Sequence, residues 1–272
     1  MIYLRVIWEE CKKHLKILLS YPLEIVYWVF FPIIWVIPFI FQGKAFVGGL
    51  SSQSFMKLTG SGQFIPFVLI GAIVSTFMFS AMYGVANCFR MENFWGTLEY
   101  ILIAPVSKFM LFAGKSLFES LFSIAYALIQ AGICVFVFGV ELTLHKILPV
   151  LLIMSLLIIG LYGLGIALSG ITLIIKESHG LIHMLDNIFY LFSPIRYPVE
   201  INPVTRIISL GIPLTYALIA IRGIILLSKP LSALIKEILI LILIDVILLG
   251  IGIYSFYICE RKARLSGTLG HY

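Results

Sequence analysis

The sequence predicts an all-α membrane protein with six transmembrane helices. The chain of 272 residues is 61% hydrophobic and 12% charged, whereas soluble domains carry about 25% charged residues. Several uncharged apolar blocks are long enough to cross a membrane as helices, and charged residues collect between them. This length suffices for a single transmembrane domain, residues 1–272, and leaves little room for an appended soluble domain.

Residues 1–20 are expected to form an amphipathic helix lying on the membrane surface. Apolar positions recur there at helical spacing, and the charged positions fall mostly on the other side. The alternative is a solvated extension of the first span. The charged positions are Arg5, Glu9, Lys12, Lys13 and Lys16.

The apolar blocks predict spans at about residues 23–42, 64–89, 112–138, 147–175, 180–198 and 238–258. Pro32 and Pro38 should kink the first span, because proline removes a backbone donor. Small residues in the fourth span predict close packing against another helix of the same chain. They are Gly160, Gly163, Gly165, Ala167, Ser169 and Gly170.

Basic residues at both chain ends predict that both termini lie in the cytoplasm. A seventh span in the apolar stretch 207–227, which carries Gly211, Pro213 and Arg222, would separate the two ends. Residues 199–229 are therefore predicted to form a re-entrant or interfacial hairpin on the outer side. Irregular backbone at membrane depth needs protein or water around it. The same topology places the loop between spans 2 and 3 in the cytoplasm.

That loop, residues 90–108, is the most informative segment of the chain. Gly96 should divide it into two short helical pieces, and Pro105 should end the second. An apolar face is expected from Phe94, Trp95, Leu98, Ile101 and Leu102, with charged anchors at Arg90, Glu92 and Glu99. A soluble partner could bind such a segment. The alternative is an interfacial turn that contacts only lipid headgroups.

Polar residues form rows along three predicted spans, at spacings of three and four that share one helix face. Such rows should face other helices or water, as a pathway lining or as hydrogen bonds between helices. The second interpretation is preferred for spans 2 and 3. The rows are Thr76, Ser80, Tyr83 and Asn87; Ser116, Ser120, Ser123 and Gln130 beside Glu119; and His179, His183, Asp186 and Tyr190.

Two further groups of ionisable residues could carry function. His179 and His183 could share a metal ion, but no further ligand is evident nearby, so a protonatable cytoplasmic entrance is preferred. Asp245 lies inside span 6, where a carboxylate needs a partner or water. It could bind a cationic substrate, serve as a proton site, or pair with Lys236 or Arg222, and the sequence leaves these options open.

The loop resembles a known family signature. The run Arg90-x-Glu92-x-x-x-Gly96-Thr97-Leu98-Glu99-x-x-Leu102-x-x-Pro105-x-Ser107 is similar to the cytoplasmic loop of ABC-2-type permeases, the membrane subunits of ATP-binding-cassette exporters. The stretch from Pro213 to Arg222 resembles the region before their last span. The prolines at 194, 198 and 203 resemble their external re-entrant region. The resemblance extends over nearly the whole chain.

The resemblance implies that the loop is a coupling helix seated in a groove of a separate cytoplasmic ATPase subunit. Closure of two ATPases around ATP would move this chain and a second, identical or related permease half between inward- and outward-facing states. Membrane lipid is a further expected partner, and nucleic acid is not. The residues expected to couple to the ATPase are Arg90, Glu92, Trp95, Gly96, Thr97, Leu98, Glu99 and Pro105.

The chain is expected to be a transport subunit and not an enzyme. The run Gly114-Lys115-Ser116 is similar to the end of a phosphate-binding loop, but position 109 is Phe where that motif needs glycine, and no strand precedes it. ATP and Mg²⁺ are therefore expected on the partner ATPase, and no cofactor or metal on this chain. The expected location is the cytoplasmic membrane.

By the same resemblance, substrates should sit between spans 2 and 5 of the two halves. Aromatic spans with few charges favour a hydrophobic or amphipathic substrate such as a drug, a lipid or a lipid-linked glycan. A self-contained secondary transporter or channel is the alternative, but it predicts internal repeats and charged midplane residues, of which only Asp245 is clear. The candidate pathway residues are Phe77, Phe79, Met82, Tyr83, Asp186, Phe189 and Phe192.

Overall fold

The computed structural model describes residues 2–27, 30, 31, 34, 37, 38, 41, 53–104, 107–138, 144–175, 179–199 and 203–265. Regular structure within these residues is helical, with no strand. The predicted first span and the loop after it lie largely outside the described residues. The helices are α1 (Ile2–Ser20), α3 (Gln53–Thr59), α4 (Phe64–Ala86), α5 (Cys88–Phe94), α6 (Leu98–Ile103), α7 (Lys108–Phe138), α8 (Leu144–Ile175), α9 (His179–Phe192), α10 (Pro203–Leu210), α11 (Pro213–Ile225), the short 3₁₀ helix η2 (Leu231–Leu234) and α12 (Ile235–Leu265).

Four of the described helices are long and apolar enough to cross a membrane: Phe64–Ala86, Lys108–Gly132, His145–Ile175 and Leu231–Leu265. They correspond to the predicted spans 2, 3, 4 and 6. A fifth crossing is added if α10 and α11, which meet at an angle of 98°, count as one broken span. The chain is thus a helical membrane protein with several crossings.

The predicted span 5, residues 180–198, is shorter than expected. Its helix, α9, has 14 residues and ends at Phe192, which gives a length of about 21 Å against a hydrocarbon thickness of about 30 Å. The chain turns at Ser193, Pro194 and Ile195 instead of continuing. Pro194 has no backbone N–H, and proline biases the preceding residue away from helical geometry.

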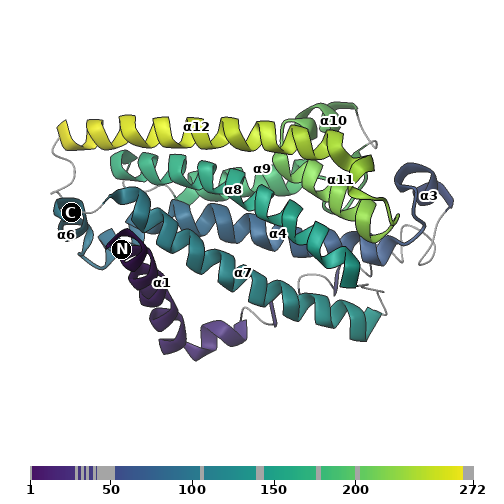
Figure 1. Cartoon of the computed structure of the whole chain (residues 1–272), viewed down its shortest axis with the longest axis horizontal. Helices are drawn as coiled ribbons and strands as arrows, with labels where there is room; N and C mark the ends of the chain where they lie inside the picture. Colours follow the sequence, from purple (N-terminus) through teal and green to yellow (C-terminus); the bar gives the residue numbers. More distant parts are fainter. Residues whose placement is uncertain are drawn as a thin grey trace.

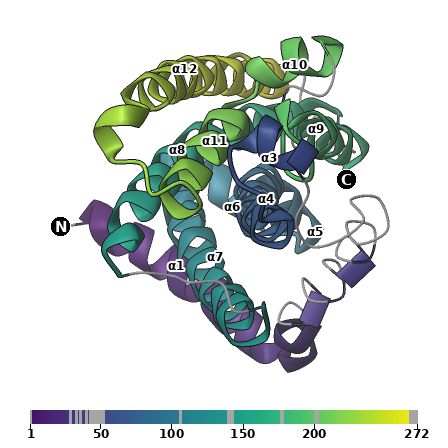
Figure 2. The ribbon, with the colours of Figure 1, turned by 90° about the vertical axis from the view of Figure 1, so that its right-hand side faces the viewer.

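The long helices lie side by side, with the small ones gathered at the two ends (Figure 1). α1, α5, α6 and the C-terminal end of α12 occupy one end, whereas α3, α10 and α11 occupy the other. The end-on view shows α12 and α7 on opposite sides of the bundle with α4 and α8 between them (Figure 2). An ion pair of 3.4 Å between Lys108 and Glu260 joins the beginning of α7 to the last turns of α12.

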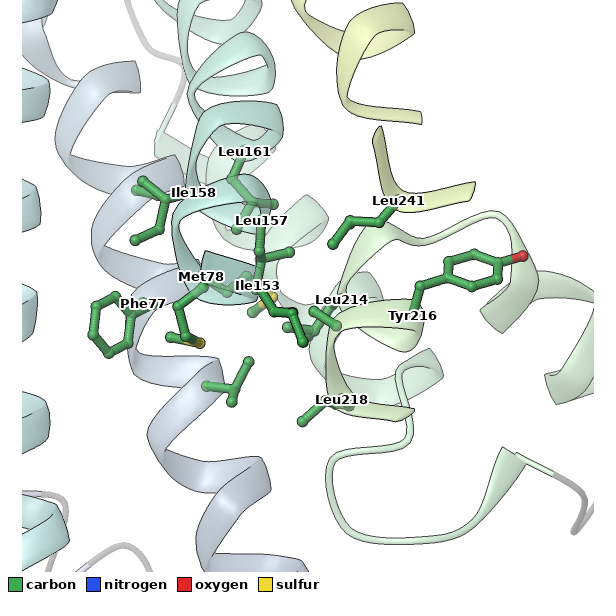
Figure 3. Close-up of a cluster of buried hydrophobic side chains, with 14 of the residues drawn as sticks. Phe77, Met78, Ile153, Leu157, Ile158, Leu161, Leu214, Tyr216, Leu218 and Leu241 are labelled. Atoms are coloured by element: carbon green, nitrogen blue, oxygen red, sulfur yellow. The ribbon is translucent and has the colours of Figure 1, made fainter. Parts of the chain in front are cut away.

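The main core lies where α4, α8 and α11 meet (Figure 3). Met78 from α4, Leu157 from α8 and Leu214 from α11 are fully buried there. In a membrane, lipid tails are as apolar as these side chains, so the helices associate through close packing more than through exclusion of water. The shapes of facing side chains therefore determine how the helices pack.

Glycines bring the backbones of α8 and α12 into contact. A Cβ atom added to Gly252 would lie 2.1 Å from the backbone oxygen of Gly163, and one added to Gly163 would lie 2.7 Å from the backbone oxygen of Leu248. Side chains larger than hydrogen would force these helices apart. The expected role of the small residues in span 4, packing within the chain, is confirmed.

Arg222 fastens the turn after α9 to the bundle. Its guanidinium group is buried and donates hydrogen bonds to the backbone oxygens of Pro194, Ile195 (2.8 Å) and Phe67 (2.9 Å). Gly71 makes room for this arrangement, since a Cβ atom there would lie 2.1 Å from the oxygen of Ile195. Arg222 is thus occupied by backbone oxygens from α4 and the turn.

We predict that Gly252→Ala destabilises the protein by about 1–3 kcal/mol, the usual penalty for overpacking a tight contact. Gly250→Ala is the matched control, because no described atom lies within 4 Å of the added methyl group. Thermal unfolding in detergent should show a lower midpoint for the first variant alone. Equal midpoints would contradict the backbone contact between α8 and α12.

Candidate functional site: the coupling segment and its supports

The coupling segment, defined here as residues 88–104, consists of two short helices joined by a sharp elbow. α5 follows α4 after a turn at Asn87, whose amide donates a 2.9 Å hydrogen bond to the backbone oxygen of Tyr83. Gly96 forms the elbow with φ of +70°, a conformation that other residues adopt only with strain. The predicted break at Gly96 is confirmed, and Pro105 lies outside the described residues.

Leu98 holds the coupling segment against the bundle. Only 3% of it is exposed, and it packs in a cluster that includes Phe89, Phe112 and Phe256. The sequence placed Leu98 on an apolar face open to a partner, with Phe94 and Trp95. In the structure Leu98 lies on the side of α6 that faces the bundle, where it anchors the segment.

Glu92 is also directed inward. It is 4% exposed, and its carboxylate accepts a 2.6 Å hydrogen bond from the Thr97 hydroxyl and lies 2.5 Å from the Lys13 ammonium. The backbone N–H of Thr97 donates to the backbone oxygen of Glu92 at 2.9 Å, which closes the elbow. Glu92 therefore joins α5, the elbow and α1.

Arg90 occupies the inner end of the segment. Its guanidinium group lies 3.3 Å from Nδ1 of His179 and 3.5 Å from the amide oxygen of Asn87. Of the three charged anchors expected from the sequence, two thus contact this chain. The third, Glu99, is exposed.

Large apolar side chains cover the outer side of the segment. Phe94, Tyr100 and Ile103 are 83%, 77% and 82% exposed. Positions 99, 100 and 103 share one side of α6 by the helical period, a signal already present in the sequence that could have identified Tyr100 and Ile103. We call the exposed set the coupling face; its members are Met91, Phe94, Trp95, Glu99, Tyr100 and Ile103.

An ionic cluster between α1 and α5 contacts the segment on the side that faces the bundle. The Lys13 ammonium lies 2.7 Å from Glu10 and 2.5 Å from Glu92, and Nε2 of His14 lies 3.1 Å from Glu10. Burial raises the pKa of Glu10, but hydrogen bonds from His14 and Lys13 outweigh it and hold this pKa below its ordinary value.

Glu10, His14 and Glu92 bring their ligand atoms within 4.8 Å of one another, a spacing that could suit a metal ion. The Lys13 ammonium already lies between the two carboxylates and supplies the positive charge there. The cluster is therefore best described as an ion-pair network.

The polar rows on α4 and α7 face each other. The Ser80 hydroxyl donates to Glu119 at 2.7 Å, and the Gln130 amide donates to Thr76 at 3.2 Å. Ser120 and the Tyr162 hydroxyl of α8 are 2.7 Å apart. The preferred interpretation for spans 2 and 3, hydrogen bonding between helices, is confirmed for these residues.

The histidines of α9 meet the start of the coupling segment. Nε2 of His183 lies 3.0 Å from Nε2 of His179, and the Tyr83 ring contacts both imidazoles. Because the guanidinium group of Arg90 can only donate, Nδ1 of His179 acts as acceptor and its Nε2 carries the hydrogen that points to His183. Asp186, one turn further along α9, is buried.

The model of the ABC-2 type transporter family matches residues 27–226, which include α3 to α11. The chain belongs to the ABC-2 type transporter family. It is accordingly a multi-pass membrane protein that functions in transport. No curated protein matched the chain in a sequence comparison.

The candidate pathway residues of this ABC-2 transporter differ in their burial. Phe77 and Met82 are buried in the core between α4, α8 and α11. Phe79, Phe189 and Phe192 are half-buried beside that core, and the Phe79 ring lies 5.8 Å from the Tyr190 ring. The remaining two are Tyr83, which is exposed, and Asp186.

Asp245 lies in the contact between α8 and α12. A Cβ atom on Gly160 would come within 1.9 Å of its Oδ1 atom, so the carboxylate fills the space that glycine leaves. Among the described residues neither of its oxygens has a hydrogen-bond partner. Of the options that the sequence left open for Asp245, a pairing with Arg222 is not observed, because the guanidinium group of Arg222 donates to backbone oxygens.

We predict that acidification destabilises this ABC-2 transporter partly through His14. Burial is the main reason that the pKa of His14 lies below its ordinary value, and the nearby Lys115 acts in the same direction. The unfolded chain therefore binds a proton at a higher pH than the folded chain. The stability that this difference contributes is present above the ordinary pKa of about 6.5 and is lost as pH falls toward the folded value.

The measurement is the midpoint of thermal unfolding at about pH 7.5 and about pH 5.5, on either side of the ordinary histidine pKa. His14→Gln should lose less of its midpoint than the native chain, since glutamine keeps a donor for Glu10 and does not titrate. The other histidines are present in both proteins and cancel in the comparison. Equal losses would contradict the role of His14.

Proposed function

We propose that this chain is the permease half of an ATP-driven exporter, and that a separate cytoplasmic ATPase subunit binds its coupling face. The supporting observation is a row of large apolar side chains that are exposed to solvent, on a segment that the buried side chains of Glu92 and Leu98 hold against the bundle. Exposure of the side chains of Phe94, Tyr100 and Ile103 to water is energetically unfavourable. Exposed apolar patches of this kind mark protein or membrane contacts. Glu99 adds one charge to an otherwise apolar surface.

The position of the coupling face favours a cytoplasmic partner. α1, the coupling segment and the last turns of α12 lie at the same end of the bundle (Figure 1). Basic residues concentrate there: Lys12 and Lys16 on α1, and Arg261, Lys262 and Arg264 on α12. By the positive-inside rule this end faces the cytoplasm, where ATP is available to a soluble subunit.

The described helices are compatible with six crossings and an external re-entrant region at 199–229. α1 and the start of α4 lie at opposite ends, so the chain between them has to connect the two sides. α10 and α11 lie at the end away from the coupling segment, and their 98° bend fits a re-entrant hairpin. Under this topology α9, although short, brings the chain from the cytoplasmic side toward that hairpin.

ATP and Mg²⁺ would be bound by the partner, and this chain would perform no hydrolysis. The run Gly114-Lys115-Ser116 lies inside α7, where Gly114 is covered by α1 and the Lys115 ammonium is 2.8 Å from Glu119. A phosphate-binding loop instead presents free backbone N–H groups to the anion. These contacts support the expectation that the run has no role with nucleotide.

The transported substrate would be hydrophobic or amphipathic: a drug, a lipid or a lipid-linked glycan. Two copies of this chain, or this chain and a related permease, would enclose it beside α4 and α9 and alternate between inward- and outward-facing states. On these two helices the side chain of Tyr83 is exposed, and those of Phe79 and Phe189 are half-buried. Phe77 and Met82, which lie in the core, would shape the pathway only indirectly.

Tyr100→Ala should weaken binding of the ATPase. Truncation of a central aromatic side chain at an interface commonly costs about 2 kcal/mol, or roughly 30-fold in affinity. The test is purification of the chain from its native membranes in mild detergent, followed by identification and quantitation of the ATPase that accompanies it. The variant should retain little of it.

Tyr3→Ala is the matched control, because Tyr3 has a similar exposure of 65% but belongs to α1, which lies at the same end of the bundle (Figure 1). It should retain the ATPase in full. Equal retention by both variants would contradict the assignment of the coupling face. Absence of any ATPase with the intact native chain would instead favour a self-contained transporter.

A further inference from the structure

We propose that α1 transmits movement of the coupling segment to α7. Lys13 is the positioning residue that joins α1 to the segment, because its ammonium lies between Glu10 of α1 and Glu92 of α5. The proposal rests on the proposed function, because it assumes that a bound ATPase moves the segment. The observation that carries it is an unbroken row of polar contacts that begins at the elbow, passes through α1, enters α7 and ends on α4.

The row begins at the coupling segment. Thr97 beside the elbow donates to one oxygen of Glu92, and the other oxygen lies 2.5 Å from the ammonium of Lys13. The side chain of Glu92 is only 5% exposed. Removing the cation from a buried carboxylate is costly, but the Lys13 side chain is 34% exposed, so the cost is smaller than for a fully buried pair. A displacement of α5 away from Lys13 would break this ion pair, so movement of α5 together with α1 is favoured.

The row continues along α1 to α7. Lys13 lies 2.7 Å from Glu10, Glu10 lies 3.1 Å from Nε2 of His14, and Nδ1 of His14 lies 3.5 Å from the ammonium of Lys115 on α7. Close packing reinforces this junction. A Cβ atom on Gly114 would lie 2.8 Å from the backbone oxygen of Ile7 and 2.6 Å from Cβ of Glu10. α1 is therefore pressed onto the first turns of α7 and moves with them.

Glu119 completes the row inside the bundle. It lies 2.8 Å from Lys115, and it accepts a 2.7 Å hydrogen bond from Ser80 on α4. Gly84 leaves no spare volume, since a Cβ atom there would come within 2.4 Å of the Glu119 carboxylate. α4 is joined to the coupling segment directly through Asn87. α7 follows the segment in the chain, and its Phe112 packs in one cluster with Leu98. The row is therefore a second route to α7, through α1, and it keeps α7 in register with α4.

A neighbouring ion pair on α1 shows what an ordinary surface contact looks like. Lys12 lies 3.0 Å from Glu9, and both side chains are well exposed, at 41% and 57%. Such pairs contribute about 0–1 kcal/mol and can be removed with little effect. Lys12 has the same charge and nearly the same position in the chain as Lys13, and it lies outside the row. It is the matched control.

The test measures hydrogen–deuterium exchange of the purified complex with its ATPase, with and without ATP and vanadate to trap the nucleotide. In the native complex, trapping should change exchange in residues 88–103, in α1 and in residues 108–118. Lys13→Met should keep the change in residues 88–103, lose it in α1 and reduce it in residues 108–118, which keep their direct link to the segment. Lys12→Met should behave as the native complex, and Lys13→Arg should restore the response.

Glu92→Gln breaks the same contact from the other side and serves if Lys13→Met does not accumulate in the membrane. A change in α1 and in residues 108–118 that is as large in both variants as in the native complex would overturn the role of α1 while leaving the proposed function intact. A native complex whose exchange changes only in residues 88–103 would overturn it as well. If no ATPase accompanies the native chain, the proposed function and this inference fail together.

Discussion

The buried carboxylate of Glu92 makes the contacts on which the arrangement of one end of the bundle, the end with α1, α5 and α6, depends (Figure 1). It closes the elbow through Thr97, holds α1 through Lys13, and fixes which side of the coupling segment faces the bundle. With Glu92 and Leu98 turned inward, the helical period turns Glu99, Tyr100 and Ile103 outward. A buried charge of this kind contributes little net stability, because desolvation opposes the ion pair, but its geometry is strict.

Elsewhere the bundle is held by contacts suited to an apolar solvent. Backbone groups are satisfied within helices, and glycines let α8 and α12 meet at their backbones. Hydroxyl, amide and carboxyl groups then pair between α4, α7 and α8. At the opposite end of the bundle, Arg222 donates hydrogen bonds to backbone oxygens of the turn after α9. Each end of the bundle therefore relies on one basic residue, the half-buried Lys13 or the buried Arg222, that joins segments distant in sequence.

Features that depend on neighbouring residues could be predicted from the sequence. The elbow at Gly96 follows from the freedom of glycine, and the long helices follow from uncharged stretches. The helices of spans 2, 3 and 4 were therefore placed within a few residues, whereas that of span 6 extends to Leu265, past its predicted end at 258. The direction of Glu92 and Leu98 could not be predicted, because it is set by Lys13, 79 positions away, and by Phe112 on another helix. The short α9 was missed although Ser193, Pro194 and Arg196 follow Phe192, a signal in the sequence for the end of the helix. The contacts of Arg222 that stabilise the turn there could not be predicted. The candidate pathway residues are spread between core and surface for a similar reason, since one apolar helix offers no sequence signal for which face meets the core.

The central claim is that the coupling face binds an ATPase in the cytoplasm. The most direct measurement replaces Ile103 with a photoreactive phenylalanine analogue and irradiates intact membranes. We predict a cross-linked product that contains this chain and an ATP-binding subunit, and no such product when the analogue stands at the buried position of Leu98. Cross-links from position 103 to lipid alone, with the subunits of the membrane otherwise intact, would contradict the claim.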